Sequence, residues 1–461
     1  MKIGIVGAGA TGLATAYYLN KKGHEITIFE QAPFVGGQAS TFETIAGKLE
    51  RGYHHLFTSD TFILNLIEDI GLSDQMAWNN SKVGNFADGS IYDFATPIDL
   101  LKYKPMPIID RLRVGLITLY LQRLKDWKHL ENITAVDWLS SKVGKKAYDA
   151  FWKPMLIGKF GSEYFDKISM AWIWGKFHTR FASRKNTFSK EQLGYPICTF
   201  GGIFEILTKM LEQSGNKINL SKTVRQISIE NDKVAGLFYE NTPPQWTSPS
   251  KINDESFFEG EMSSKSKKND WIHEDFDKII VTAPSNIFSR LLPIGYDKYA
   301  ADLNKINYLS AVVQILVLKK RFSDIYWMNI TDESIPFVGL IEQTNLLPPK
   351  YYKNKHVLYL ANYLSKDNPM YSMDSKELLD LYIPHLQKIN PFFNETWIEE
   401  AYYQKIEGAQ PIITIDYSKI IPEHSTPIEG LFLANTSQIY PEDRGTNYSI
   451  QLAKKIDSIL D

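Results

Sequence analysis

The amino-acid sequence predicts an α/β protein built around a nucleotide-binding domain of the Rossmann type. The first thirty residues are typical of a strand, a glycine turn, a helix and a second strand. Residues from about 97 to 190 place apolar side chains at helical spacing, and residues from about 305 to 414 contain several apolar strands. The sequence therefore predicts a nucleotide domain, a helical subdomain and a strand-rich domain.

The N-terminal stretch KIGIVGAGATGLATAYYL carries the motif GxGxxG at Gly7, Gly9 and Gly12. Gly7 permits a tight turn, Gly9 lets the backbone approach a pyrophosphate, and Gly12 allows the helix to pack on the strand. Ala10 and Thr11 lie at the start of the predicted helix, whose unpaired N–H groups attract phosphate. We expect all five residues to contact a dinucleotide.

The second predicted strand, EITIF, leads directly to an acid, Glu30, which is followed by Gln31. A carboxylate at this position accepts hydrogen bonds from a ribose diol, and it repels a 2'-phosphate. NADP is therefore not expected at this site, and FAD and NAD are the remaining candidates.

The next segment, QAPFVGGQASTF, contains the glycine doublet Gly36 and Gly37. It resembles the doublet that follows the acid in the flavin-containing amine oxidase superfamily. That superfamily includes amine oxidases, protoporphyrinogen oxidases, phytoene-type desaturases and, more distantly, UDP-galactopyranose mutases. The resemblance implies that FAD is the cofactor. The superfamily usually has Arg after the doublet, whereas this chain has Gln38.

The stretch GKLERGYHHLF resembles a superfamily segment that passes close to the flavin ring. The resemblance implies that His54 and His55 lie near the ring and makes them the candidate catalytic residues. In the alternative interpretation, one is a hydrogen-bonded structural histidine and the other lies on the surface. No metal site is expected, because adjacent histidines point apart and no partner stands at ligand spacing.

The predicted helical region contains a basic amphipathic segment with Leu112 and Leu116 on one face. Such a helix either lies on a membrane surface or covers a core. The later stretch AYDAFWKPMLIGKFGSEYFDKISMAWIWGKFHTR is rich in aromatic residues. It either packs as a core or lines a channel for a large apolar substrate with an anionic end. Its cations include Lys153, Lys159, Lys176 and the substrate candidates His178 and Arg180.

The order of these regions indicates that the chain passes between domains several times. We expect the FAD-binding domain to comprise residues 1–96, 194–300 and 426–461, the helical subdomain 97–193, and the substrate-binding sheet domain 301–425. A polar surface insertion is expected at about 241–275. The superfamily resemblance implies that the sheet domain is antiparallel and floors the substrate site. It also implies that the backbone at Val224 contacts the adenine.

The closing segment LFLANTSQIYPEDRGTNYSI predicts a strand, a polar loop and a helix. In the superfamily this strand usually ends in Gly and an acid that binds the ribityl chain, whereas Asn435 and Thr436 stand here. The portion RGTNYSI resembles the flavin-facing turn of protoporphyrinogen oxidase-like members. The resemblance implies cofactor contacts at Gly445, Thr446 and Asn447, and Arg444 is a substrate candidate.

Composition excludes several classes of protein. The net charge of -2 argues against nucleic-acid binding, which needs a basic surface. The single cysteine, Cys198, excludes an internal disulfide and fits a reducing, cytoplasmic setting. No apolar run approaches the ~20 residues of a membrane-spanning helix, so at most a peripheral membrane contact is expected.

These features predict an FAD-dependent oxidoreductase that dehydrogenates a large, mainly apolar substrate by hydride transfer to flavin N5. The substrate candidates are a porphyrinogen and a polyisoprenoid, and oxygen or a quinone is the candidate electron acceptor. The alternative is a flavin-dependent isomerase of a nucleotide sugar, similar to UDP-galactopyranose mutase, with Arg180 and Arg444 available for the pyrophosphate. A third interpretation keeps the fold and loses catalysis, leaving a binding protein.

Overall fold

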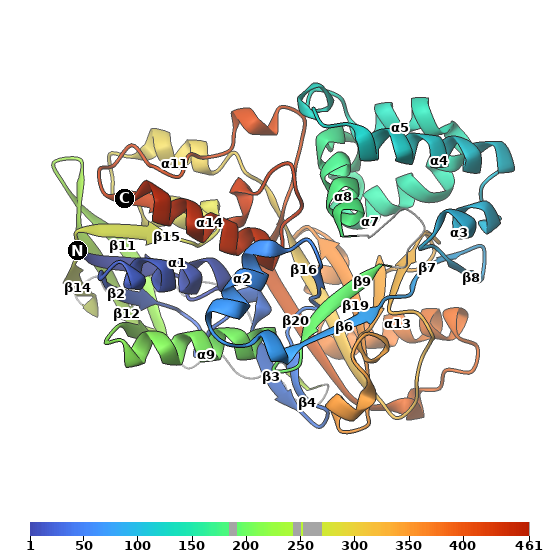
Figure 1. Ribbon diagram of the computed structural model, residues 1–461, viewed down its shortest axis with the longest axis horizontal. Helices are drawn as coiled ribbons and strands as arrows, with labels where there is room; N and C mark the ends of the chain where they lie inside the picture. The colour runs from blue at the N-terminus through green and yellow to red at the C-terminus, as the bar shows by residue number, and fades with distance from the viewer. Residues whose placement is uncertain (184–190, 243–249, 252–269, 461) are drawn as a thin grey trace.

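The computed structural model describes residues 1–183, 191–242, 250–251 and 270–460. Five strands form a parallel sheet in the order β10-β2-β1-β15-β21. They are β1 (Lys2–Val6), β2 (Glu25–Phe29), β10 (Lys217–Asn219), β15 (Lys278–Val281) and β21 (Leu431–Leu433). Three separate stretches of the chain thus build one Rossmann-type sheet, and the N- and C-terminal ends lie close to it (Figure 1).

Alternate side chains of β1 face the two sides of this sheet, as the period of a strand requires. Ile3 and Ile5 are fully buried against a layer of helices. Val6 packs on the opposite side, where a Cβ atom on Gly4 would lie 3.1 Å from the ring of Phe276. The helical layer consists of α1 (Ala10–Lys21), α9 (Phe200–Gln213) and α14 (Thr446–Ile459); the opposite layer is a three-stranded sheet of β11 (Lys222–Glu230), β12 (Lys233–Asn241) and β14 (Ile272–Asp275).

An eight-stranded sheet in the order β13-β20-β16-β19-β18-β17-β7-β8 forms the second domain. Neighbouring strands run antiparallel except β17 and β7, which are parallel. The strands are β7 (Val83–Ala87), β8 (Ser90–Asp93), β13 (Ser250–Lys251), β16 (Tyr308–Leu318), β17 (Trp327–Ile330), β18 (Gly339–Glu342), β19 (His356–Leu364) and β20 (Ile398–Pro411). β7 and β8 fall in the segment 1–96, which the sequence placed in the nucleotide domain, but pairing with β17 carries them into the larger sheet.

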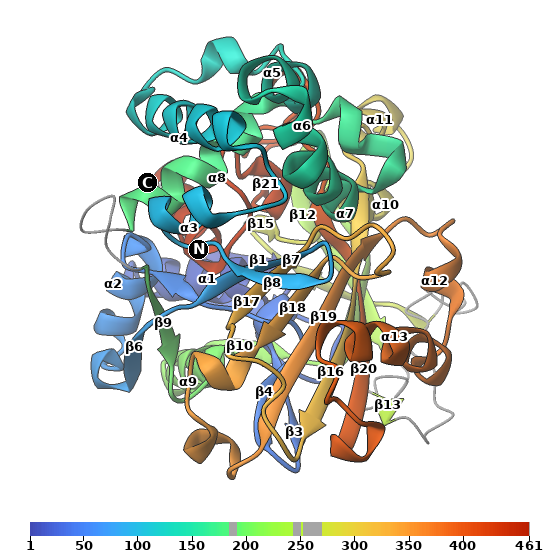
Figure 2. The ribbon, with the colours of Figure 1, turned by 90° about the vertical axis from the view of Figure 1, so that its right-hand side faces the viewer.

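Side chains of the long strand β16 pack on both faces of this sheet. Ile315 and Val317 belong to the core that joins the sheet to the nucleotide domain. Val312 and Leu316 point the other way, onto α13 (Ser375–Ile389), whose Tyr382 is 1% exposed. Figure 2 shows α13 lying on the sheet beside β16 and β20. The other face of the sheet therefore packs toward the nucleotide domain.

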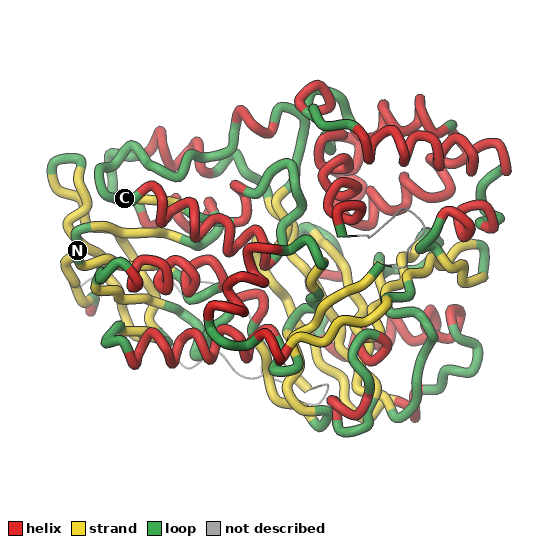
Figure 3. The backbone as a smooth tube through the Cα atoms, viewed as in Figure 1, coloured by secondary structure: helices red, strands yellow, loops and turns green. Residues whose placement is uncertain are grey.

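The helical region forms a compact cluster away from the nucleotide sheet (Figure 3). Its core is rich in aromatic residues, among them Trp138, Phe151, Phe160, Trp172 and Trp174, all buried. The helices are α3 (Pro97–Lys102), α4 (Ile108–Arg123), α5 (Ala135–Val143), α6 (Lys145–Ala147), α7 (Lys153–Tyr164) and α8 (Met170–Ala182). Along the described residues, no helix combines the length and apolar character needed to cross a membrane.

The remaining elements connect these layers. They are the hairpin β3 (Thr41–Thr44) and β4 (Gly47–Glu50), the small sheet of β5 (Leu56–Phe57), β9 (Gln192–Pro196) and β6 (Met76–Asn80), and the helices α2 (Thr61–Asp69), α10 (Ser285–Leu291), α11 (Asp297–Leu303) and α12 (Pro369–Ser372). Most of the polar insertion predicted at 241–275 lies outside the described residues.

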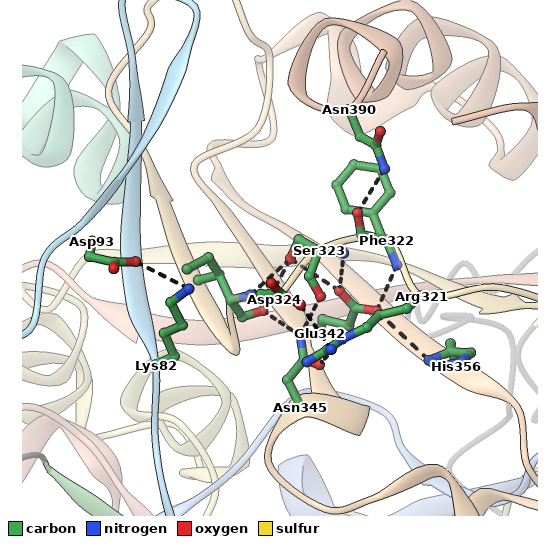
Figure 4. A network of polar contacts seen from close by, with 11 residues as sticks. Lys82, Asp93, Arg321, Phe322, Ser323, Asp324, Glu342, Asn345, His356 and Asn390 are labelled. Carbon is green, nitrogen blue, oxygen red and sulfur yellow. Dashed lines mark hydrogen bonds and ion pairs between the residues drawn. The ribbon is translucent and has the colours of Figure 1, made fainter. Parts of the chain in front are cut away.

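A fully buried carboxylate, Glu342, ties β18 to the loop before β17 (Figure 4). It accepts hydrogen bonds from the backbone N–H groups of Phe322 and Ser323, at 2.8 and 2.6 Å, and from the Ser323 hydroxyl at 3.1 Å. Burial raises the pKa of Glu342 to about 7, although these donors favour its charged form. These hydrogen bonds hold the loop in place, and Nδ1 of His356 lies 4.0 Å from the same carboxylate.

Candidate functional site

The glycines of the first turn have distinct physical roles. A Cβ atom on Gly7 (φ 107°) would lie 2.5 Å from the hydroxyl of Thr282, and one on Gly12 would lie 2.0 Å from the Gly7 carbonyl oxygen. On Gly9 the nearest atom would be the Cα of Gly37, at 3.9 Å. Gly7 and Gly12 are thus required by packing, whereas Gly9 leaves space beside the backbone for a ligand.

Helix α1 starts at Ala10, directly after that open space. Its N-cap is Gly9, and no side chain caps the first turn. Ala10 is half-buried and Thr11 is 7% exposed. The first N–H groups of a helix lack intrahelical partners and carry positive potential, so this end is suited to a phosphate.

The acid at the end of β2 lies beside the glycine turn. The Glu30 carboxylate accepts hydrogen bonds from the N–H groups of Ala8 and Ala32, both at 2.8 Å. Burial raises its pKa, and these backbone donors oppose that effect. Gln31 is exposed, and the Glu30 carbonyl accepts from Lys222 N–H at 2.9 Å at the start of β11. This bond brings β11, with Val224 6% exposed, next to Glu30.

The glycine doublet is packed directly on the first turn. Gly36 donates its N–H to the Ala8 carbonyl at 2.8 Å, and it has φ 96°. Gly37 has φ 55°, and a Cβ atom there would lie 3.1 Å from the Cα of Gly9. Only glycine adopts both conformations readily at such a close approach. The two glycine segments, 29 residues or so apart in the chain, thus form one surface, with Gly37 exposed and Gln38 half-buried on it.

The closing loop leads into α14 at the same surface. Gly445 is the N-cap of α14 and is exposed, while Thr446 is half-buried. The Asn447 side chain accepts hydrogen bonds from the N–H groups of Phe62 and Ile63, at 2.9 and 3.2 Å, and so anchors the start of α2. The Asn447 side chain is therefore already bonded within the protein.

Asn435, at the end of β21, is also tied into the protein. Its side chain donates to the Ala283 carbonyl at 2.9 Å and accepts from the Ser437 N–H at 3.0 Å. With Gln438 it forms a capping box around the short turn that begins at Thr436. The buried Asn435 side chain therefore shapes the loop, and its contact with a cofactor remains a prediction.

Arg444 connects the surface formed by the two glycine segments, the candidate cofactor surface, to the eight-stranded sheet. Its guanidinium donates to the side-chain oxygens of Gln410 and Gln38 at 3.1 and 3.2 Å, and to the Tyr363 hydroxyl at 3.3 Å. Tyr363 lies on β19, and its hydroxyl shares a hydrogen bond of 3.3 Å with that of Tyr53. One side chain of the closing loop thus contacts the doublet segment and both strands β19 and β20.

Asp443, the neighbour of Arg444, lies close to two lysines of the helical region. The Lys176 ammonium lies 2.5 Å from its carboxylate, and the Lys159 ammonium lies 4.0 Å away. The indole N–H of Trp172 donates to it at 3.2 Å. Burial alone would raise the pKa of Asp443, but Lys176 and Lys159 outweigh it and hold that pKa well below its usual range.

Helix α8 presents these groups on one face, because Trp172 and Lys176 are one turn apart. The helix approaches the closing loop very closely at Gly175, where a Cβ atom would lie 2.3 Å from the Pro441 carbonyl oxygen. One turn further on, Thr179 shares a hydrogen bond of 3.1 Å with the hydroxyl of Tyr448 on α14. The helical region is thus docked on the loop that borders the cofactor surface.

The histidine pair is enclosed between this loop and the sheet. The Nδ1 atom of His54 donates to the Gly52 carbonyl at 2.7 Å, and Nδ1 of His55 shares a hydrogen bond of 3.0 Å with Tyr326. Burial, together with the charge of Arg444, lowers the pKa of His54 to about 4. Burial, followed by the charge of Arg180, lowers the pKa of His55 to about 3. Both imidazoles are therefore neutral at pH 7.

A family profile for flavin-containing amine oxidoreductases matches residues 10–442, nearly the whole chain. The chain belongs to this family. Membership makes it an FAD-dependent oxidoreductase, in agreement with the resemblance seen at the glycine doublet.

Three relatives illustrate the range of the family. The chain is 21% identical to zeta-carotene desaturase of Zea mays over 488 residues, which cover 95% of this chain and 79% of the relative. It is 21% identical to the probable zeta-carotene desaturase of Synechococcus elongatus, over 95% of this chain and 93% of the relative. Coproporphyrinogen III oxidase of Staphylococcus aureus is 22% identical over 62% of this chain and 61% of its own length.

Solved structures show the same fold. Reduced UDP-galactopyranose mutase superposes with a TM-score of 0.75 at 16% identity, over 100% of this chain and 95% of the other. A putative protoporphyrinogen oxidase from Exiguobacterium gives 0.71 at 16% identity, over 100% and 98% of the two chains. Putrescine oxidase bound to putrescine gives 0.70 at 13% identity, over 100% and 99%.

The surface built from the two glycine segments fits FAD. Gly9 leaves room at the backbone, the N-terminus of α1 lacks a side-chain cap, and the Glu30 carboxylate lies beside the turn. Gln38 stands where the superfamily usually has Arg, but a positive charge is still present at this position. Arg444, from the closing loop, donates a hydrogen bond to the Gln38 side chain. The departure from the usual Arg is therefore offset locally.

The two substrate candidates on α8 differ in position. His178 is exposed, and its ring stacks on Trp174 at 4.8 Å between centroids. Arg180 is half-buried and lies close enough to His55 to lower its pKa. Arg180 and Arg444 therefore both act on the histidine pair, whereas His178 packs on the outside of its helix. The described residues contain no cluster of three His, Cys, Asp or Glu side chains suited to a metal ion.

Sequence reasoning missed Tyr53, Tyr363 and Asp443 as members of the site. Tyr363 lies on a strand that is buried along most of its length, and the sequence does not distinguish it from a core tyrosine such as Tyr359. Asp443 directly precedes Arg444 in the closing loop. An acid next to a base was the sequence feature that could have indicated a role for Asp443 in the site. Lys159 appeared only among the cations of the aromatic stretch, and the fold is what brings it to Tyr363.

Proposed function

We propose that this oxidoreductase dehydrogenates a large, mainly apolar substrate of the porphyrinogen or polyisoprenoid type by hydride transfer to N5 of FAD. The observation that carries this proposal is the wall of rings beside the cofactor surface. Tyr53 and His55 meet the ring of Trp327 edge to face, at 5.1 and 5.7 Å between centroids. Desaturases of zeta-carotene and an oxidase of coproporphyrinogen among the relatives support a substrate of this size and character.

In this proposal the cofactor is held by the surface described above. The residues are Gly7, Gly9, Ala10, Thr11, Gly12, Glu30, Gln31, Gly36, Gly37, Gln38, Val224, Asn435, Thr436, Gly445, Thr446 and Asn447. Glu30 binds the ribose, and the N–H groups of α1 bind the pyrophosphate. At Asn447 the backbone makes the contact, because its side chain is already bonded within the protein.

FAD supplies the hydride acceptor when it is bound, and the chain supplies orientation and exclusion of water. Dehydrogenation removes a hydride and a proton from the substrate, and the electrons pass on to oxygen or a quinone. His54 keeps its Nδ1 proton on the Gly52 carbonyl, which leaves Nε2 free to accept a proton. Its low pKa makes it a weak base, so its main contribution is a neutral hydrogen-bonding group in an apolar wall.

A second function is favoured by one observation. Among the described residues, Arg444 donates only to neutral side chains, which leaves its charge for a ligand such as the pyrophosphate of a nucleotide sugar. UDP-galactopyranose mutase has the same fold. In such an isomerase FAD acts without net oxidation of the substrate.

The visible spectrum of the purified holoprotein distinguishes these functions. Protoporphyrinogen, a polyisoprenoid and a UDP-hexose are added separately under anaerobic conditions. Bleaching of the flavin band by either of the first two establishes a dehydrogenase and selects its substrate class. A band that stays oxidised with all three, but shifts with the sugar after chemical reduction, contradicts the dehydrogenase and supports the isomerase.

The cofactor assignment is tested by Gly9→Val, which fills the space that Gly9 leaves at the backbone. We expect FAD to be lost on gel filtration while the far-UV circular dichroism stays unchanged. Gly115→Val is the matched control, because the nearest atom to its Cβ position, 3.8 Å away, belongs to the helical region. Normal flavin content in Gly9→Val would overturn the placement of the cofactor.

We further propose that helices α3 and α4 rest on the surface of an anionic membrane. They expose large apolar side chains whose exposed fractions lie between 44% and 69%: Ile98, Leu101, Ile108, Ile109, Leu112, Leu116 and Tyr120. On α4 four of these stand four residues apart, so they form a stripe. Exposed cations flank the stripe, namely Lys102, Lys104, Arg113 and Arg123. Apolar and basic residues on one face match a lipid surface with anionic headgroups.

Cosedimentation with phosphatidylserine vesicles tests this contact. The double variant Leu112→Glu/Leu116→Glu should lose vesicle binding, while Ile294→Glu, which changes an apolar side chain that is 98% exposed elsewhere, should retain it. Equal binding by all three proteins would contradict the proposal. A wild-type dimer that the double variant dissociates would instead make this face an interface between two copies.

A further inference from the structure

The helical region and the closing loop bring more positive charge to the site than the neighbouring acid can balance. Lys176 and Lys159 both point to Asp443, and Arg444 is its neighbour in the chain. Lys176 takes the carboxylate at 2.5 Å, whereas Lys159 remains at 4.0 Å. Three cations therefore surround one carboxylate.

Arg444 has the stronger unused capacity. A guanidinium carries five N–H donors, and three hydrogen bonds of Arg444 go to the neutral oxygens of Gln38, Gln410 and Tyr363. Within the part of the chain that the structure describes, no carboxylate lies within ion-pair distance of Arg444. Two N–H groups and a full positive charge are left for a partner from outside the protein.

Lys159 lies over the ring of Tyr363. Its ammonium lies 4.0 Å from the centre of the Tyr363 ring, whose hydroxyl is the group that Arg444 contacts. The Lys159 side chain is 18% exposed, and burial lowers its pKa. Burial would raise the pKa of Tyr363, but Lys159 and Arg444 outweigh it and lower that pKa. The phenol thus lies beside two positive charges, and the one on Lys159 is 4.0 Å from the Asp443 carboxylate.

We propose that Lys159, Arg444 and the Tyr363 hydroxyl form a subsite for one anionic group, a carboxylate or a phosphate, at the end of an otherwise apolar substrate. This inference rests on the proposed dehydrogenase and narrows its substrate. A hydrocarbon forms no favourable interaction with two partly buried cations, so it cannot offset the free energy of their desolvation. A porphyrinogen with carboxylate side chains, or an isoprenoid with a terminal phosphate, pairs with both.

The neighbouring aromatic wall sets how the rest of such a molecule lies. Tyr363 is bonded to Tyr53, which packs on Trp327. An anionic end at Lys159 and Arg444 therefore leaves the apolar body against these rings, next to the histidine pair. The subsite acts as an anchor, and the reacting carbon is placed by the distance between the two ends of the substrate.

Ligand binding to the holoprotein tests this subsite without turnover. Perturbation of the flavin spectrum by protoporphyrin is compared with that by its dimethyl ester, and geranylgeranyl diphosphate is compared with geranylgeraniol. Lys159→Gln and Arg444→Gln should each raise the Kd of the acid of the preferred pair by about 10-fold or more, as expected for loss of a charged hydrogen bond. The Kd of the neutral partner should change little.

The matched control is Lys167→Gln, because Lys167 also lies over a tyrosine, Tyr164, at 5.3 Å in the same region. It should bind both ligands like the wild type, and Lys159→Arg should restore much of the acid binding. Equal binding of acid and neutral ligand by the wild type would overturn the subsite. Loss of FAD from the Gln variants would overturn it too, because the cations would then serve the cofactor.

The two proposals fail in different ways. If protoporphyrinogen and the isoprenoid leave the flavin oxidised but the acid still binds through Lys159, the dehydrogenase is wrong and the subsite stands. If the flavin bleaches and Lys159→Gln changes neither kcat nor KM, the dehydrogenase stands and the subsite is wrong.

Discussion

Two enclosed acids show how differently this chain surrounds a negative charge. Glu342 receives two backbone N–H groups and a hydroxyl, and burial raises its pKa to about 7. Asp443 is surrounded by Lys176, Lys159 and Arg444, and its pKa is lowered despite burial. Glu342 can lose its negative charge by taking up a proton, as a structural side chain can. The second stands among excess positive charge, which is typical of a place that receives an anion.

Removing the charge of Asp443 should have the largest effect. Asp443→Asn leaves Lys176 and Lys159 facing each other without a counter-ion. We expect the free energy of unfolding to fall by about 2 kcal/mol, between the values for exposed and fully buried ion pairs. Affinity for an acidic ligand should rise on the order of 5-fold, because a like charge beside the ligand is gone.

Urea denaturation and the ligand titration measure the two effects on the same protein. Their opposite directions are the informative part, since simple damage to the fold would weaken both stability and binding. Weaker binding of the acid in Asp443→Asn would show that Asp443 orients the cations more than it competes with the ligand. Ser334→Ala is a suitable control, because Ser334 caps a separate ion pair between Lys388 and Asp332.

Glu342→Gln should change stability less and ligand binding not at all. The amide can accept at only one of its two ends, so one of the donors at Phe322 and Ser323 loses its partner, at a cost of about 1 kcal/mol. The sign of the pH dependence follows from the raised pKa. Folding favours the protonated acid, so the stabilisation by wild-type Glu342 is present below pH 4.5 and is lost as the pH rises toward about 7.

The stability difference between wild type and Glu342→Gln should therefore shrink from pH 4.5 to pH 7. Thermal denaturation across this range checks it. A difference that grows with pH would mean that Glu342 is ionised in the folded protein and that the donors around it outweigh burial.

The nucleotide half of the site could be predicted from sequence because its constraints are local. Gly7 and Gly12 are required by atoms within a few residues or on the adjoining strand, Gly9 leaves space in the same turn, and such local constraints leave a motif. The doublet at Gly36 and Gly37 carries a similar signal, since its positive φ angles restrict the residue type. The Rossmann fold and the FAD cofactor follow from these positions.

The substrate half could not be predicted in the same way. Lys159, Tyr363 and Arg444 come from α7, β19 and the closing loop, and no short spacing links them. A lysine in an aromatic helix and a tyrosine in an apolar strand each have an ordinary role in packing. Only the close approach of α8 to the loop at Gly175, and the docking that goes with it, gathers their charges at one point.

The smallest expected effect is on the pH dependence of flavin reduction, which tests the pKa values of His54 and His55. Burial and the nearby arginines lower the pKa of His54 to about 4 and of His55 to about 3. The rate of anaerobic flavin reduction should therefore show no step near pH 6.5, and His55→Ala should slow it without shifting its pH profile. Stability behaves differently: the unfolded chain binds protons at both histidines below pH 6.5, so the free energy of unfolding falls as the pH drops. A step in the rate near pH 6.5 that His55→Ala removes would show that His55 keeps its ordinary pKa in the holoprotein, and that burial and the charge of Arg180 do not lower it.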